Sequence, residues 1–165
     1  MQILNAILAS LTFSGLVMAE CRFENIVPKK VKQETAKQLC MTQGEGDWTF
    51  AMATSLSVVP SLSSDASNGL AGASGGATFI IYDNNCMPRA VYDAPSCGVP
   101  YVAKENFLKW VLSVNTVDMG VGSPYFSFTY AAGKYSIRNN HCVCSDMSHG
   151  LTGAKGCRCA FPVKG

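Results

Sequence analysis

Charged side chains are scarce in this sequence of 165 residues, since Asp, Glu, Lys and Arg together make up only 15% of it. Globular domains average about 25% charged residues. The formal net charge of +2 is too small to create the broad basic field that coats many nucleic-acid phosphates. Because hydrophobic residues reach 48%, the chain can bury a core, and intrinsic disorder is disfavoured. We therefore expect a folded protein with no nucleic-acid partner.

Residues 1–19 contain no Asp, Glu, Lys or Arg at all. The stretch is mostly apolar from Ile3 to Val17 and ends at Ala19, which is typical of a secretory signal peptide cleaved after Ala19. It falls short of the roughly 20 apolar residues that span a bilayer, which disfavours the alternative of a retained membrane anchor. The sequence thus predicts a signal peptide at 1–19 and a single secreted domain at 20–165, with no membrane partner.

Motifs that would specify a reaction are missing. No Asn is followed by x-Ser/Thr, so N-glycosylation is not expected, and no glycine loop continues into Gly-Lys-Ser/Thr to bind phosphate. Residues 72–76 place a serine between glycines, but no strand precedes them, so a strained nucleophile elbow is not expected. The sequence indicates no cofactor, and we assign no catalytic residue.

Cysteine, in contrast, is plentiful. All eight cysteines follow residue 19, and an even number in a secreted chain implies four disulfides. A zinc site is disfavoured, because an oxidising route converts close thiols into disulfides and structural zinc sites usually show C-x-x-C rather than C-x-C spacing. The predicted disulfide cysteines are Cys21, Cys40, Cys86, Cys97, Cys142, Cys144, Cys157 and Cys159.

The two C-x-C pairs restrict the connectivity. Residues two apart in a strand have Cα atoms about 6.5–7 Å apart, at the edge of disulfide reach, so each pair is expected to bond elsewhere. We expect long-range disulfides that tie the amino-terminal segment to the carboxy-terminal one. In the alternative, the two pairs bond to each other across a hairpin, which leaves Cys21, Cys40, Cys86 and Cys97 as the remaining set.

Hydrophobic periodicity predicts both helices and strands. Helical spacing and terminal signals indicate helices over 28–43 and about 104–113, the latter with a possible continuation as a strand. Alternation indicates a half-buried strand near 48–60 and strands at 78–82 and 89–92, with a mobile Gly- and Ser-rich loop over 61–76. The fold class expected is α+β, with about four antiparallel strands packed against two helices.

The carboxy-terminal third gives the clearest strand signals. Residues 125–130 and 135–138 form a predicted hairpin around residues 131–134, with Gly133 available for a positive φ. Alternation puts Phe126, Phe128 and Tyr130 on one face, which we expect to be core, with a partly exposed binding strip as the alternative. The final segment is expected to form two C-x-C strands joined by a Gly-rich loop.

The two histidines, His141 and His149, support a competing enzymatic hypothesis. They titrate near neutral pH, and with Lys134 or Lys155 they could supply the acid, base and phosphate contact of a secreted ribonuclease. The simpler interpretation is that His141 is a strand residue and His149 a loop residue.

The leader, the mature length and the cysteine pattern resemble those of secreted cysteine-rich effectors of plant-associated fungi. The features are Cys21 directly after the leader, Cys40 in a predicted helix, and Cys142 and Cys144 near the end. The chain most resembles the Leptosphaeria avirulence-supressing family and its extracellular-protein relatives from leaf-mould fungi. That resemblance implies a four-stranded antiparallel sheet packed on helices, and no catalytic residues.

The resemblance also implies a function. We expect a monomeric, non-catalytic virulence or avirulence effector that is secreted into the host apoplast, with possible onward entry into host cells. Its expected partner is a host plant protein or immune receptor. The alternatives are a small secreted hydrolase such as a ribonuclease using His141 and His149, and an antimicrobial or killer-toxin-like protein.

Overall fold

The computed structural model describes residues 20–26, 39–55, 59–60, 70–71, 76–118, 125–139, 141–146 and 154–165. The predicted signal peptide at 1–19 lies outside the described residues, as do most of the helix expected over 28–43 and most of the loop expected over 61–76. Leu70–Ala71 within that loop (β4) pairs with Val59–Pro60 (β3).

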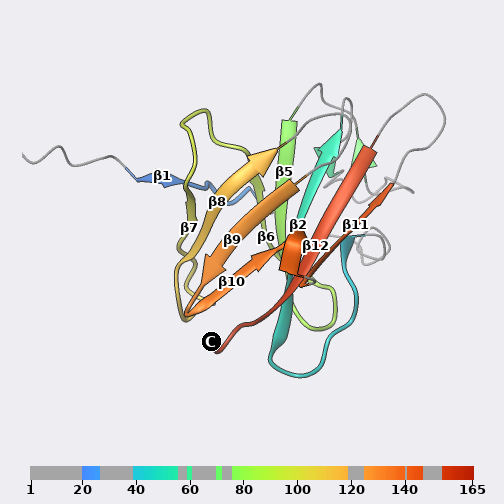
Figure 1. Ribbon diagram of the computed structural model, residues 1–165, viewed down its shortest axis with the longest axis vertical. Coiled ribbons are helices and arrows are strands. Elements are labelled where there is room, and N and C mark those ends of the chain that lie inside the picture. The colour runs from blue at the N-terminus through green and yellow to red at the C-terminus, as the bar shows by residue number, and fades with distance from the viewer. Residues whose placement is uncertain are drawn as a thin grey trace, which may run out of the picture.

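The described chain is built almost entirely of strands, which form two five-stranded sheets (Figure 1). Sheet A has the order β1 (Cys21–Arg22), β7 (Tyr101–Ala103), β8 (Leu112–Asp118), β9 (Tyr125–Tyr130), β10 (Gly133–Ser136). Sheet B has the order β11 (Cys142–Asp146), β12 (Ala154–Pro162), β2 (Asp47–Ser55), β5 (Gly76–Tyr82), β6 (Pro88–Asp93). All neighbours pair antiparallel except β1 and β7.

The expected α+β fold is therefore wrong, and the protein is a β-sandwich. In place of the second predicted helix, residues 104–111 form turns and bends, and Leu112–Asp118 forms β8. Trp110 and Val111 mimic a helical stripe, yet they are 49% and 45% exposed. Leu112 and Val114 alternate instead with outward polar residues, and the β-branched content of this stretch suits a pleated surface.

The main core lies between the two sheets and is rich in aromatic rings. Phe128 of β9 stands near its centre, with ring centroids 4.9 Å from Phe50, 4.8 Å from Tyr135 and 5.9 Å from Phe161. Phe126, Phe128 and Tyr130 are at most 1% exposed. Core packing of this face, rather than an exposed aromatic strip, is thus confirmed.

The β9–β10 hairpin is confirmed, with a tighter turn than expected. Tyr130 pairs with Gly133, so only Ala131 and Ala132 form the loop, and the positive φ (50°) falls on Ala131 rather than Gly133. Gly133 is needed for space: a Cβ there would lie 2.7 Å from ring atoms Cε2 and Cζ of Tyr135. The glycine thus lets the Tyr135 ring fold back over its own strand.

The expected half-buried strand near 48–60 also needs correction. The strand β2 is buried on both faces rather than one, since Phe50, Ala51 and Met52 are all 0% exposed. Its outer face belongs to a second cluster of buried residues on the outer side of β2, β5 and β6. That cluster comprises Leu39, Cys40, Ala51, Ala53, Ile80, Tyr82, Cys86 and Val91.

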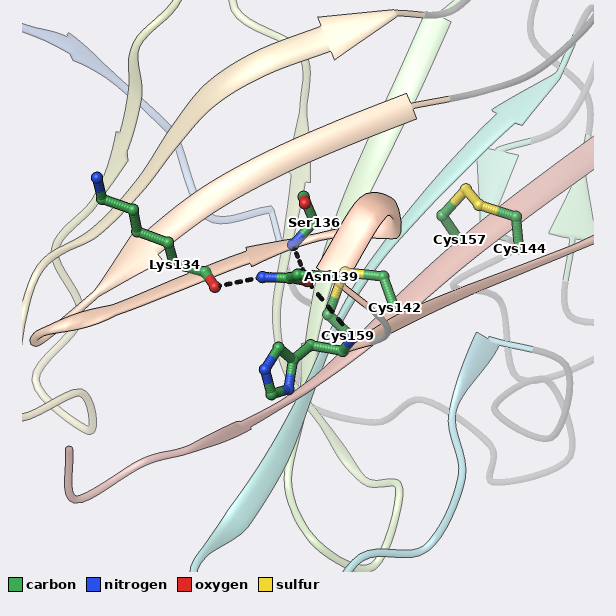
Figure 2. The surroundings of a disulfide bond; sticks show 8 residues. Lys134, Ser136, Asn139, Cys142, Cys144, Cys157 and Cys159 are labelled. Carbon is green, nitrogen blue, oxygen red and sulfur yellow. Dashed lines mark hydrogen bonds between the residues drawn. A yellow bond between two sulfur atoms is a disulfide. The ribbon is translucent and has the colours of Figure 1, made fainter.

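All eight cysteines form disulfides, as expected, but the favoured long-range links between the termini are wrong. The C-x-C strands β11 and β12 form a hairpin in which Cys142 faces Cys159 and Cys144 faces Cys157, and these facing pairs are bonded (Figure 2). Directly opposite positions in an antiparallel ladder bring the two Cα atoms to 4.0 Å in both pairs. The remaining set pairs as Cys21–Cys97 and Cys40–Cys86.

Candidate functional site

The outer face of sheet A carries an open groove of about 490 Å³. It runs over β8, β9 and β10, which form the layer of Figure 1 opposite β2, β5 and β12. Among the described residues that line it, none carries a carboxylate. The lining residues are Asn115, Tyr125, Ser127, Phe128, Thr129, Lys134, Tyr135 and Ser136.

The alternation of β9 explains why this face is polar. Along Tyr125–Tyr130 the residues are alternately half-buried and buried, so the three aromatic residues at 126, 128 and 130 enter the core. Tyr125, Ser127 and Thr129 therefore point outward, because successive side chains of a strand project to opposite faces. The groove floor is thus fixed by the same pattern that builds the core.

A β-bulge in β8 adds one further polar group to the groove. Val114 is opposite Phe128 and Thr116 is opposite Ser127, so two residues of β8 occupy one step of β9 and Asn115 is the extra residue. Asn115 and Thr116 are consecutively exposed, which breaks the strict alternation of the strand. Bulges re-aim side chains and are frequent beside functional sites. Here the bulge turns the Asn115 amide into the groove.

The Asn115 amide is held in place by two hydroxyl groups. Its Nδ2 donates to Thr129 Oγ1 at 3.4 Å, and its Oδ1 accepts from Ser113 Oγ at 3.4 Å. This short relay leaves the second Nδ2 proton of Asn115 as a donor for a ligand, since an amide nitrogen has two.

Positive charge lies at both ends of the groove. Lys134 of β10 is exposed, and no ion-pair partner for its ammonium occurs among the described residues. At the other end the guanidinium carbon of Arg138 lies 5.3 Å from the ring centroid of Tyr125. Such cation–π contacts stabilise an exposed pair by about 0.5–1 kcal/mol, which limits the motion of both side chains.

The free edge of β10 is closed by a side chain from the 3-10 helix η2 (Ile137–Asn139). Asn139 Nδ2 donates to the Lys134 carbonyl at 2.7 Å, and Asn139 Oδ1 accepts from the Ser136 N–H at 3.0 Å. Figure 2 shows this amide in the place where another strand would bond, with the Lys134 side chain extending away from the disulfides. Two of the edge groups that could recruit another strand, the Lys134 carbonyl and the Ser136 N–H, are thereby satisfied.

The structure does not bring His141 and Lys134 to one side of the sheet. The imidazole of His141 lies edge-on to Tyr135, at 5.6 Å between centroids, and Tyr135 points into the core. Lys134, the preceding residue, projects from the opposite face of β10 into the groove. His149, the second member of the ribonuclease hypothesis, lies outside the described residues, and Lys155 lies in β12 of sheet B.

Sequence reasoning considered Lys134, as part of a ribonuclease site, and missed the other polar residues of the groove. The Ser and Thr positions between the aromatics of β9 were the available signal, since they mark a solvated face. The contribution of Asn115 depends on the bulge, which no local pattern indicated. In the parts of the chain that the structure describes, no cluster of three or more His, Cys, Asp or Glu side chains could hold a metal ion.

No family model matches the chain, and neither a curated protein nor a solved structure matches it. The structure defines a disulfide-stapled β-sandwich with an open polar groove, and its four disulfides are compatible with an extracellular protein. No helix among the described residues has the length and apolar character of a membrane span.

Proposed function

We propose that this chain is a secreted effector of a plant-associated fungus that acts without catalysis, by binding a host plant component through the groove of sheet A. The observation that carries the proposal is the groove itself. Hydroxyl, amide and ammonium groups converge there on three paired strands, and groups fixed on strands lose little freedom when a ligand binds.

Secretion is supported by two separate features of the chain. Residues 1–19 have the composition of a signal peptide. Two of the four disulfides join β11 to β12, and the other two tie Cys21 of β1 and Cys40 to cysteines in loops; such bonds persist in oxidising compartments. The fold implied by the resemblance to the Leptosphaeria family, helices on a four-stranded sheet, differs from this sandwich. The proposal therefore relies on the leader, the disulfides and the groove.

The test compares three oxidised, secreted proteins infiltrated into leaves, with ion leakage and the burst of reactive oxygen as readouts. The groove variant is Asn115→Ala with Lys134→Gln, and the histidine variant is His141→Ala with His149→Ala. We expect the wild type and the histidine variant to alter the plant response equally and the groove variant to lose the effect. Asn115, Lys134 and His141 are exposed, and near-ultraviolet circular dichroism checks that each protein is folded.

The reverse result would favour the hydrolase alternative. Loss of the plant response in the histidine variant, together with cleavage of RNA by the wild type alone, would overturn the proposal. Growth inhibition of microbes by the purified protein, with no effect on leaves, would also overturn it in favour of the antimicrobial alternative.

A further inference from the structure

The groove has a regular pattern of hydroxyl groups across its strands. Thr129 of β9 lies in register with Ser113 of β8 and Lys134 of β10. Two residues along, Ser127 lies in register with Thr116 and Ser136. Paired strands lie about 4.8 Å apart, so the face carries one row of three hydroxyls (Thr116, Ser127 and Ser136) and a neighbouring row in which the hydroxyls of Ser113 and Thr129 are followed by Lys134. Each hydroxyl can both donate and accept a hydrogen bond, which suits a ligand that itself carries hydroxyls at regular intervals.

The aromatic content of the groove fits the same kind of ligand. Tyr125 is half-buried at one end, and its ring position is supported by Arg138 at 5.3 Å. An aromatic ring beside a hydroxyl-rich surface offers an apolar face for the C–H groups of a sugar and a phenol for its hydroxyls.

The charge distribution of the groove indicates which charge a bound ligand should carry. Asp118 is in register with Tyr125, so at that end of the groove it accompanies Arg138 and the two formal charges are opposite. Lys134 lies beside Thr129, four residues further along β9 and thus about 13 Å away. The surplus positive charge of the groove is therefore at Lys134, where an ammonium without an ion-pair partner among the described residues can contact a carboxylate.

The edge of the sheet argues against an extended peptide as the occupant. A peptide would gain most of its affinity by adding a strand to β10 through backbone hydrogen bonds. Asn139 already occupies the Lys134 carbonyl and the Ser136 N–H (Figure 2). Binding across the face of the strands remains open, and the groove lies on this face.

We propose that the groove binds an acidic oligosaccharide, with Asn115 and the hydroxyls of β9 and β10 contacting sugar hydroxyls and Lys134 contacting a uronic-acid carboxylate. This inference rests on the proposed function and names the chemical class of the bound component.

The experiment titrates the oxidised, secreted protein by isothermal calorimetry with oligogalacturonate and with the same oligosaccharide after reduction of its carboxyl groups to alcohols. We expect binding of the acidic form that weakens with added salt, and binding of the reduced form that is about tenfold weaker or more, because a charge-assisted hydrogen bond is lost. Lys134→Gln should weaken binding of the acidic form by a similar factor and leave that of the reduced form unchanged. Asn115→Ala should weaken binding of both forms.

The matched control is Lys109→Gln, which removes an equal charge from the loop between β7 and β8, where Lys109 Nζ donates to the Lys164 carbonyl. This variant should bind as the wild type does. Equal binding of the acidic and reduced oligosaccharides, or equal weakening by Lys109→Gln and Lys134→Gln, would overturn the inference. Absence of binding to either oligosaccharide, while the groove variant still loses the leaf response, would overturn the inference and leave the proposed function standing.

Discussion

The outer faces of the two sheets differ, although both sheets contribute to the same core. On sheet A the outer side of β9 is half-exposed at every second residue and carries the groove. On sheet B, six consecutive residues of β5 from Ala77 to Tyr82 are buried, and the second apolar cluster covers the outer side. Sheet A is therefore solvated on its outer face, whereas β2 and β5 at the centre of sheet B are buried on both faces.

This difference indicates that the two sheets have different roles, one structural and one in ligand binding. Sheet B is the structural layer, held from outside by the Cys40–Cys86 disulfide and Leu39, and it holds the inner aromatic face in place. Sheet A shares that inner face but leaves its outer face to solvent and ligand. Substitutions at equivalent outward positions should consequently disturb stability on sheet B and binding on sheet A.

The largest effect should come from placing a charge at matched outward positions of the two sheets. Ala51→Asp on β2 buries a carboxylate at a position that is 0% exposed, which should cost about 3–5 kcal/mol of unfolding free energy. Ser127→Asp on β9 places the same group in the groove, where a surface substitution should change stability by no more than about 0.5 kcal/mol. Guanidinium unfolding of both variants measures the contrast.

If Ala51→Asp fails to fold, Ala51→Ser provides a milder version of the same test. The hydroxyl should still lower the unfolding midpoint, because a buried polar group without a partner costs about 1–3 kcal/mol. Equal stability of the Ala51 and Ser127 variants would show that the outer face of sheet B is solvated in solution.

The sequence predicted sheet A better than sheet B for a physical reason. In β9 one face is polar, so alternation marks the strand and assigns its inward residues correctly. In β2 and β5 both faces are apolar, so alternation of large and small residues predicted a strand but not the burial of its second face. The helix predicted near residues 104–113 was wrong because Phe107, Leu108 and Val111 have helical spacing although they lie in a loop.

The disulfide connectivity and the groove depended on information that is not local. Eight cysteines allow 105 pairings. The register of β11 and β12 determines two of the actual pairs, because it places Cys142 opposite Cys159 and Cys144 opposite Cys157. Likewise, Asn115 reaches the groove only because a bulge in β8 adds one residue. Register and bulges arise from pairing between strands distant in sequence.

The next largest effect concerns the disulfides of sheet B. Replacing Cys40 and Cys86 by serine opens a loop of 46 residues, whereas replacing Cys144 and Cys157 opens one of 13. Loop-closure entropy predicts a loss of about 4 kcal/mol of unfolding free energy for the first pair. The loss for the second pair should fall well below the roughly 3 kcal/mol of an isolated loop, because the Cys142–Cys159 bond still closes a loop of 17 residues around it. Guanidinium denaturation of the two double variants, with Ellman titration to confirm that no free thiol remains, measures both. A larger loss for the hairpin disulfide would show that the Cys40–Cys86 disulfide contributes little to the stability of sheet B.

The smallest effect is a pH dependence that originates on the outer face of sheet B. Burial raises the pKa of the Tyr82 phenol above its ordinary value of 10.0. The folded protein therefore keeps this proton where the unfolded chain releases it, so the stabilisation is complete below pH 10 and is lost as the pH rises above it. At pH 11 the loss from Tyr82 is on the order of 1 kcal/mol. Tyr82→Phe, which cannot ionise, should reduce the fall in unfolding free energy between pH 7 and pH 11 by that amount. Parallel pH profiles for the variant and the wild type would mean that water reaches Tyr82, and that the outer face of sheet B resembles that of sheet A.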